Sequence, residues 1–217
     1  MNGCLSERYR AGCFGMREWR LSGGRRENGM LWFWGGAAAF GLFVLYDVNS
    51  VIWKKRNLHS FFSLGVLLLL AVTGICLLRE FGESRISRSP AALLYLIPSL
   101  VCLGLMVYSL FFALPFAETY VREPGRDAVC DRGMYALCRH PGVLWFCMTY
   151  LFLALAWGTA QIWGMAVFYS LLNMGYVVLQ DRWTFPRTFE DYEGYRKRAP
   201  FLIPTAGSMK RAWETRR

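Results

Sequence analysis

The chain has 217 residues, of which 55% are hydrophobic and 17% aromatic, and its formal net charge is +10. This composition is too apolar for an ordinary soluble domain. The basic residues lie between and after apolar stretches, which is typical of the cytoplasmic side of a membrane protein and argues against nucleic-acid binding. The seven cysteines show no Cys-x-x-Cys spacing, so the sequence predicts neither a zinc site nor a disulfide framework.

Residues 1–29 are polar, contain six arginines and show no apolar periodicity. They lack the apolar core and the small-residue cleavage site of a signal peptide. We therefore expect a basic, disordered N-terminal arm. A second interpretation is that translation starts at Met30, directly before the first apolar stretch.

Four apolar stretches follow, at Leu31–Tyr46, Phe61–Leu78, Ala91–Phe116 and Val143–Leu179. The last is too long for one membrane crossing, and a polar break that starts at Gly158 divides it near its middle. A crossing needs about 20 apolar residues, and a lipid-exposed backbone must satisfy its own hydrogen bonds. The sequence predicts an all-α integral membrane protein with about five transmembrane helices. Residues 30–116 would hold three of them, and residues 117–217 would form a C-terminal module around the other two.

The distribution of Lys and Arg predicts the orientation of these helices. If the N-terminus lies outside, the predicted inner loops and the C-terminal segment hold sixteen basic residues and the outer segments hold nine. The positive-inside rule then places the C-terminus in the cytoplasm, with the cell membrane as the expected location. The six arginines of the N-terminal arm oppose this orientation, and the conflict disappears if translation starts at Met30.

Two polar blocks lie at the two feet of the last apolar hairpin, Asp131–Pro141 before it and Gln180–Pro204 after it. We expect them to converge on one site. In the first block, Arg139 offers a planar fork for a carboxylate or phosphate, and His140 a tunable donor or base. Pro141 stands where a helix would begin, and a helix N-terminus attracts anions.

In the second block, Thr188-Phe-Glu-Asp191 predicts a helix N-terminus of the capping-box type, with the helix beginning at Thr188. Tyr192, Tyr195 and Arg196 would follow on a basic amphipathic helix at the membrane surface, stopped by Pro200. Asp181 precedes it at the edge of the membrane. A carboxylate there is costly unless it is paired, which favours either a function or a salt bridge.

These motifs resemble the isoprenylcysteine carboxyl methyltransferase family, whose C-terminal module is shared by related phospholipid methyltransferases. The resemblance covers roughly the last third to half of the chain. It rests on Gly133-x-Tyr135-x-x-x-Arg139-His140-Pro141-Gly142, then a hydrophobic hairpin, then Glu190-Asp191-Tyr192-x-x-Tyr195-x-x-x-x-Pro200-x-x-Ile203-Pro204.

The resemblance implies methyl transfer from S-adenosylmethionine, without a metal, to a prenylcysteine-type carboxylate or a phospholipid amine. The lipid-like or prenylated acceptor would enter sideways from the bilayer, and the cofactor would occupy a cytosolic pocket between the last two helices and the C-terminal segment. Asp181 and Arg139 would be catalytic, Asp181 through the cofactor's ammonium or the acceptor. The cofactor-binding residues implied are Gly133, Tyr135, Arg139, His140, Pro141, Gln180, Glu190 and Tyr192.

The chain departs from the family pattern in or near the implied pocket. Val143 and Trp145 replace a tyrosine and a glycine after Arg-His-Pro, Gln180-Asp181 replaces a Glu-Glu pair, and Thr188-Phe189 replaces a Phe-Gly pair. Two alternatives therefore stay open. One is a sterol-reductase-like membrane enzyme that uses NADPH, and the other is a non-catalytic membrane protein that keeps the fold.

Simpler roles also stay open for single residues. His140 could cap the helix that follows it, and Arg139 could extend to lipid phosphates. Tyr192 and Tyr195 could be interfacial anchors, and Asp181 could form only a salt bridge.

Overall fold

The computed structural model of the protein describes residues 30, 32–55, 58, 60–111, 127–129 and 131–215. The predicted N-terminal arm, residues 1–29, lies outside the described residues. So do residues 112–126, which include the end of the third predicted helix and the start of the predicted C-terminal module.

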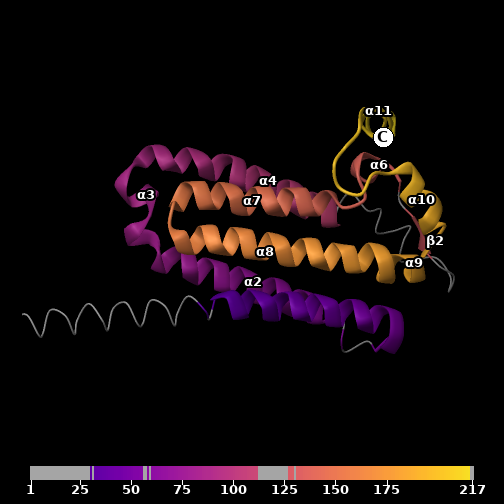
Figure 1. The fold of residues 1–217 in the computed structure, drawn as a ribbon, viewed down its shortest axis with the longest axis horizontal. Helices are drawn as coiled ribbons and strands as arrows, with labels where there is room; N and C mark the ends of the chain where they lie inside the picture. The colour runs from indigo at the N-terminus through magenta and orange to yellow at the C-terminus, as the bar shows by residue number, and fades with distance from the viewer. Residues whose placement is uncertain are drawn as a thin grey trace, which may run out of the picture.

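Long helices that run alternately up and down one axis make up the body of the molecule (Figure 1). Four of them are long and apolar enough to cross a membrane: Trp32–Trp53, Ser60–Arg79, Pro90–Leu110 and Ala160–Thr188. The described chain is thus consistent with the predicted all-α membrane protein. The expected fifth crossing corresponds to a shorter apolar helix, α7 (Pro141–Trp157).

The helices have irregular segments at defined places. The first helix ends in a π-helical turn, η1 (Asn49–Trp53), and α2 spans Ser60–Arg79. The third begins as a 3-10 helix, η4 (Pro90–Tyr95), and continues as α4 (Leu96–Phe111).

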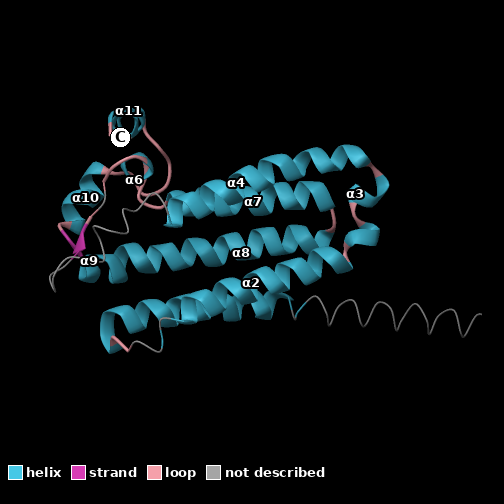
Figure 2. Ribbon diagram, turned by 180° about the vertical axis from the view of Figure 1, so that it is seen from behind, coloured by secondary structure: helices cyan, strands magenta, loops and turns pink. Residues whose placement is uncertain are grey.

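The short elements gather at the two ends of the helices (Figure 2). At one end, η3 (Phe81–Glu83) and α3 (Arg85–Arg88) connect α2 to η4, beside the turn between α7 and α8. The opposite end holds the C-terminal elements and α6. These are α6 (Met134–Leu137), η5 (Gln180–Thr184), α9 (Phe185–Thr188), β2 (Phe189–Glu190), α10 (Tyr192–Arg198) and α11 (Ala206–Glu214).

The predicted break in the last apolar stretch is confirmed. Gly158 ends α7 in the left-handed conformation, with φ of 71°, and its N–H bonds to the carbonyl of Ala154. Thr159 then caps α8 (Ala160–Leu179) by accepting the N–H of Ile162. Glycine tolerates positive φ and threonine is a favourable N-cap, so two adjacent residues end one helix and start the next.

The core lies where the first helix, α2, α7 and α8 meet. Tyr169 of α8 is fully buried, and its hydroxyl donates to the carbonyl of Trp32 over 2.8 Å. Gly36 permits this contact, because a Cβ there would lie 2.0 Å from the Tyr169 ring. A hydrogen bond of 2.8 Å joins the side chains of Thr73 and Tyr150, from α2 and α7. The hairpin is therefore locked to the N-terminal half of the chain.

One local prediction is wrong. Thr188 does not begin a helix: it ends α9, and its hydroxyl donates to the carbonyl of Thr184. Residues 189–190 are instead extended, because β2 pairs in parallel with β1 (Asp127–Ala128). Asp191 is the N-cap of α10, in the left-handed conformation and without a capping side-chain bond.

Candidate functional site

The two polar blocks meet at the carboxylate of Asp181, which is 3% exposed. Its Oδ1 accepts the hydroxyl of Tyr192 over 2.7 Å and lies 3.3 Å from Nε2 of His140. Arg139 Nε also lies 3.3 Å from Oδ1, and Arg196 Nε lies 3.5 Å from Oδ2. The expected convergence is confirmed, with one buried acid holding side chains from the loop before α7 and from α10.

The helical turn that carries Asp181 is π-helical. The N–H of Phe185 bonds to the carbonyl of Gln180, five residues back, at the end of η5. Pro186 follows directly, and a proline both lacks an N–H and crowds the carbonyl four residues before it. The wider turn accommodates this proline, and such turns recur at functional sites.

Aromatic rings enclose the basic side of the site. The ring of His140 stacks on Phe185 with centroids 5.8 Å apart, and Phe201 meets it edge-on at 5.1 Å. The guanidinium of Arg139 lies over the ring of Phe201, 5.5 Å from its centroid. His140 is the N-cap of α7, but its side chain makes no capping hydrogen bond, so it does not act as a helix cap.

The side chain of Arg139 is largely buried, but not all of its N–H donors have a hydrogen-bond partner. Its side chain is only 10% exposed, and its Nε, although close to Asp181, makes no hydrogen bond because the geometry is unsuitable. The backbone N–H of Arg139 donates to the carbonyl of Pro200, which fixes the loop against the C-terminal segment. Arg139 and Arg196 share the single carboxylate of Asp181, and the other partner of Arg196, Glu193, is exposed. The two arginines are thus balanced by Asp181 and Glu193, and the buried Nε of Arg139 is the polar group of the cluster that keeps a free donor.

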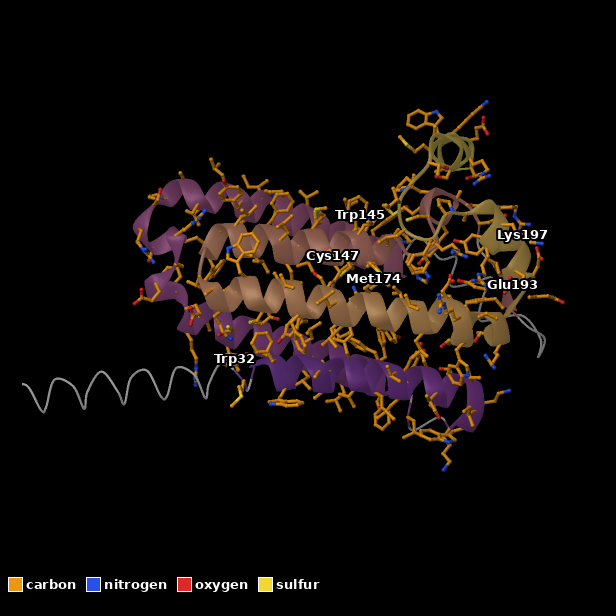
Figure 3. The ribbon with its side chains drawn as sticks, in the orientation of Figure 1. Trp32, Trp145, Cys147, Met174, Glu193 and Lys197 are labelled. Atoms are coloured by element: carbon orange, nitrogen blue, oxygen red, sulfur yellow. The ribbon has the colours of Figure 1, made fainter. Side chains whose placement is uncertain are left out.

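The tyrosines of α10 face the protein interior. Tyr192 and Tyr195 are 4% and 3% exposed. Burial and the hydrogen bond to Asp181 raise the pKa of Tyr192, which keeps its phenol protonated as a donor. The hydroxyl of Tyr195 donates to the carbonyl of Tyr135, and burial raises its pKa too. The alternative in which these tyrosines are interfacial anchors does not fit this burial, while Glu193 and Lys197 point outward (Figure 3).

Four of the predicted site residues belong to this cluster through their contacts around Asp181: Arg139, His140, Asp181 and Tyr192. Pro141 begins α7, as predicted, and is fully buried.

The other predicted residues lie elsewhere. Tyr135 is one contact away, and its own hydroxyl donates to the carbonyl of Ser109 on α4. Gly133 has φ of 55°, and its N–H donates to the side chain of Thr215 near the end of α11. Gln180 donates to the hydroxyl of Tyr176, and Glu190 is exposed on β2.

A second buried carboxylate, Asp47 of the first helix, was not predicted. It is 3% exposed, and it accepts the hydroxyls of Tyr176 over 3.3 Å and of Thr184 over 3.2 Å. Its signal in the sequence is plain, since it is the one acid in the helix Trp32–Trp53 and ionisable groups at membrane depth are costly unless they have a role. Gln180, bonded to Tyr176, belongs to this second cluster.

Among the described residues, no group of three or more His, Cys, Asp or Glu side chains is placed to hold a metal ion. Burial raises the pKa of the Cys138 thiol, next to Arg139 in the chain, to about 11. A thiol with such a pKa stays protonated near neutrality and is a poor nucleophile.

Comparisons of the chain with models of protein families, with curated proteins and with solved structures find no match. The family resemblance of the motifs therefore remains a hypothesis.

Proposed function

We propose that the chain transfers a methyl group from S-adenosylmethionine to a lipid-like acceptor. The observation that carries this proposal is the cluster around Asp181, where two arginines, a histidine and a buried tyrosine meet at one end of an apolar hairpin. When bound, this cofactor would supply a methyl group on a sulfonium, which a nucleophile takes while the sulfur keeps the bonding electron pair.

The residues of the cluster fit the anionic end of that cofactor. Arg139 has a buried Nε without a hydrogen bond and lies next to the N-terminus of the 17-residue helix α7. A guanidinium fork and a helix N-terminus both favour a carboxylate. Such an anion would give the buried Nε of Arg139 the hydrogen-bond partner that Asp181 does not provide.

The contacts of Asp181 revise the role expected for it. Its carboxylate is already engaged by Arg139, His140, Tyr192 and Arg196, so in this proposal Asp181 is a positioning residue. It orients the guanidinium of Arg139 and the ring of His140, and Tyr192 keeps it in place. Holding a nucleophile and an electrophile in the reactive geometry can supply much of the rate of such a transfer.

The acceptor is proposed to be amphiphilic because the site adjoins helices long and apolar enough to cross a membrane. A prenylcysteine-type carboxylate would become a methyl ester without losing a proton, and a phospholipid amine would release one proton on methylation. Either headgroup would approach the site from the bilayer, with the C-terminal elements on the cytoplasmic side.

A second candidate function uses the same two guanidiniums. Two guanidiniums beside a helix N-terminus also suit a phosphate, so a sterol-reductase-like enzyme that binds NADPH is the alternative. A non-catalytic protein is the third, because the hydrogen bonds of Asp181 also hold the module together without any ligand.

Binding of S-adenosylmethionine and of NADPH to the detergent-purified protein separates these functions. Calorimetry on the protein and on the Arg139→Ala/His140→Ala variant is the measurement. We expect saturable binding of S-adenosylmethionine, at least tenfold weaker in the variant because a hydrogen bond to a charged group contributes about 1.5–3 kcal/mol. Arg187→Ala is the matched control, since Arg187 is exposed at the same end and stacks on Trp183.

The variant must keep its thermal unfolding midpoint for the comparison to count, and Arg139→Lys, which keeps the charge but not the fork, serves if it does not. No saturable binding of S-adenosylmethionine by the unaltered protein would overturn the proposal. Binding of NADPH alone would then indicate the reductase, and binding of neither the non-catalytic protein.

A further inference from the structure

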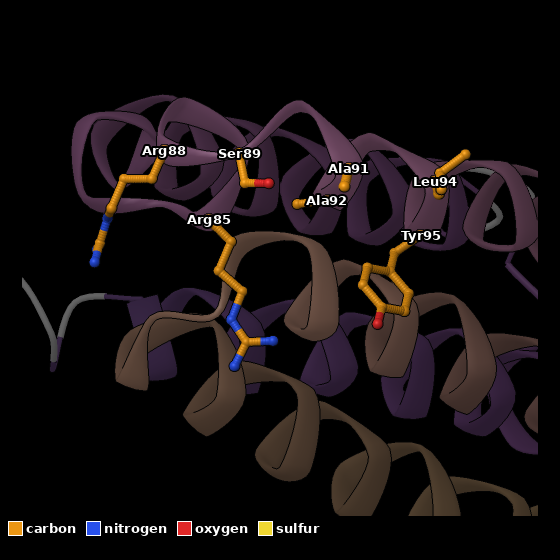
Figure 4. Close-up of a pocket in the computed structure, with 7 residues that line it drawn as sticks. All are labelled: Arg85, Arg88, Ser89, Ala91, Ala92, Leu94 and Tyr95. Atoms are coloured by element: carbon orange, nitrogen blue, oxygen red, sulfur yellow. The ribbon is translucent and has the colours of Figure 1, made fainter.

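A groove lies at the end of the molecule opposite to the Asp181 cluster (Figure 4). It has a volume of about 540 Å³ and lies along α3 and η4. Arg85, Arg88 and Ser89 line its polar side, and Ala91, Ala92, Leu94 and Tyr95 its apolar side. The groove thus has one cationic and one apolar side.

Arg85 lines this groove, and its guanidinium has no acidic partner among the residues that the structure describes. Its side chain is pressed against the turn between α7 and α8. A Cβ at Gly158 would lie 2.5 Å from Arg85 Nε. Arg88, by contrast, donates to the backbone carbonyl of Glu83 and lies 4.0 Å from its carboxylate.

The position of the groove along the helices corresponds to the expected edge of a membrane. The apolar helix α2 ends at Arg79, and the next apolar span starts at Pro90, so α3 lies between two apolar helix ends. Leu94 and Tyr95 are 66% and 39% exposed on the apolar side. Arg85 and Tyr95 project in the same direction, toward the α7–α8 hairpin (Figure 4). A headgroup beside the arginines would have its chains along η4.

We propose that this groove binds an anionic phospholipid of the bilayer, with its phosphate on Arg85 and Arg88. The charge complementarity decides between occupants, because a guanidinium without an acidic partner among the described residues pairs with a phosphate through two N–H bonds. A second hollow, along Leu100, Leu103, Gly104, Val107 and Tyr108 of α4, has no cation in its lining and gives no such preference. The bound lipid would bridge α3 to the turn of the hairpin.

Native mass spectrometry of the protein released from nanodiscs tests this proposal. The nanodiscs contain equal amounts of phosphatidylcholine and phosphatidylglycerol. We expect preferential retention of phosphatidylglycerol, reduced at least tenfold in Arg85→Gln/Arg88→Gln because the variant loses both charge-assisted contacts to the phosphate. Lys54→Gln/Lys55→Gln removes the same charge from two exposed lysines at the other end and is expected to retain the lipid.

Ala91→Phe tests the apolar side while both arginines remain, and it also serves if the double arginine variant does not fold. Its larger side chain fills the groove, so we expect it to lose phosphatidylglycerol as well. Equal retention of the two lipids by the unaltered protein, or undiminished phosphatidylglycerol in both groove variants, would overturn the proposal. Displacement of the lipid by millimolar inorganic phosphate would do so too, because it assigns the arginines to a free anion.

Discussion

At the scale of single residues, two neighbours in the sequence serve two different clusters. Gln180 points to Tyr176 beside Asp47, while Asp181 points to Arg139 and His140. Successive residues of a helix are turned by about 100°, so adjacent side chains cannot share one site. A sequence motif that aligns Gln180 and Asp181 with one pair of acidic residues cannot predict that they belong to different clusters.

The residue types of the Asp181 cluster were predictable, but their partners were not. Arg139, His140 and Tyr192 stood out because charged and aromatic groups flank an apolar hairpin. Arg196 contacts Asp181 too, and its spacing of four residues from Tyr192 on α10 places both on one helix face. Asp47 was not predicted because it belongs to none of the C-terminal motifs, although it is the one acid in the helix Trp32–Trp53.

Asp47 gives a prediction at this scale. Asp47→Ala leaves the hydroxyls of Tyr176 and Thr184 without their acceptor and opens a cavity, so we expect a loss of about 2–4 kcal/mol in the free energy of unfolding. Asp47→Asn keeps one carbonyl oxygen and offers an amide to a hydroxyl that can also accept. It is expected to cost less than about 1.5 kcal/mol.

Thermal unfolding in detergent, followed by near-ultraviolet circular dichroism, ranks the two variants. Ser50→Ala is the control, since its hydroxyl bonds only within its own helix, to the carbonyl of Tyr46. If Asp47→Asn were as damaging as Asp47→Ala, the charge rather than the acceptor oxygens would be what stabilises the fold.

At the scale of elements, the sequence predicted helix ends correctly where one or two residues determine the backbone conformation. Gly158-Thr159 ended one helix and began the next as predicted, and Pro141 occupies the first turn of α7. Local signals failed at Thr188, because the pairing of β2 with β1, a contact between distant segments, holds residues 189–190 extended. The π-helical turn η5 precedes Pro186, which marks a local change in the helix, but neither π-helical turn was predicted from the sequence.

The contact between the first helix and α8 gives the prediction at this scale. Gly36→Ala places a methyl group 2.0 Å from a ring carbon of Tyr169, which is fully buried and bonded to the carbonyl of Trp32. The ring cannot move without losing that bond, so we expect a loss of about 1–3 kcal/mol in the free energy of unfolding. The unfolding midpoint in detergent is the measurement.

Gly41→Ala is the matched control in the same helix. A Cβ at Gly41 meets nothing within 4 Å, and alanine is favoured over glycine in a helix by up to about 1 kcal/mol. The two substitutions are therefore expected to change stability in opposite directions. Equal effects would show that the first helix does not pack on α8 at Gly36.

At the scale of the whole molecule, the two ends of the helices differ in charge. The end with the C-terminal elements holds Lys54, Lys55 and most of the other basic residues that the structure describes. The opposite end holds Arg79, Arg85 and Arg88. This asymmetry supports the proposed orientation, with the Asp181 cluster on the cytoplasmic side and the proposed lipid groove on the other.

The sidedness of these two ends depends on α7, because its 17 residues span only about 25 Å at 1.5 Å per residue, against a hydrocarbon core of about 30 Å. If α7 crosses the membrane and the bilayer thins around it, the turn after α7 lies on the same side as α3.

Cysteines introduced one at a time at Lys54, Gly82, Ala160 and Lys197, with the native cysteines replaced, can be labelled in intact cells by a membrane-impermeant maleimide. We expect labelling at Gly82 and Ala160 and protection at Lys54 and Lys197 until the cells are opened. Labelling at Gly82 without Ala160 would mean that α7 and α8 do not both cross, and the reverse pattern at all four positions would invert the proposed orientation.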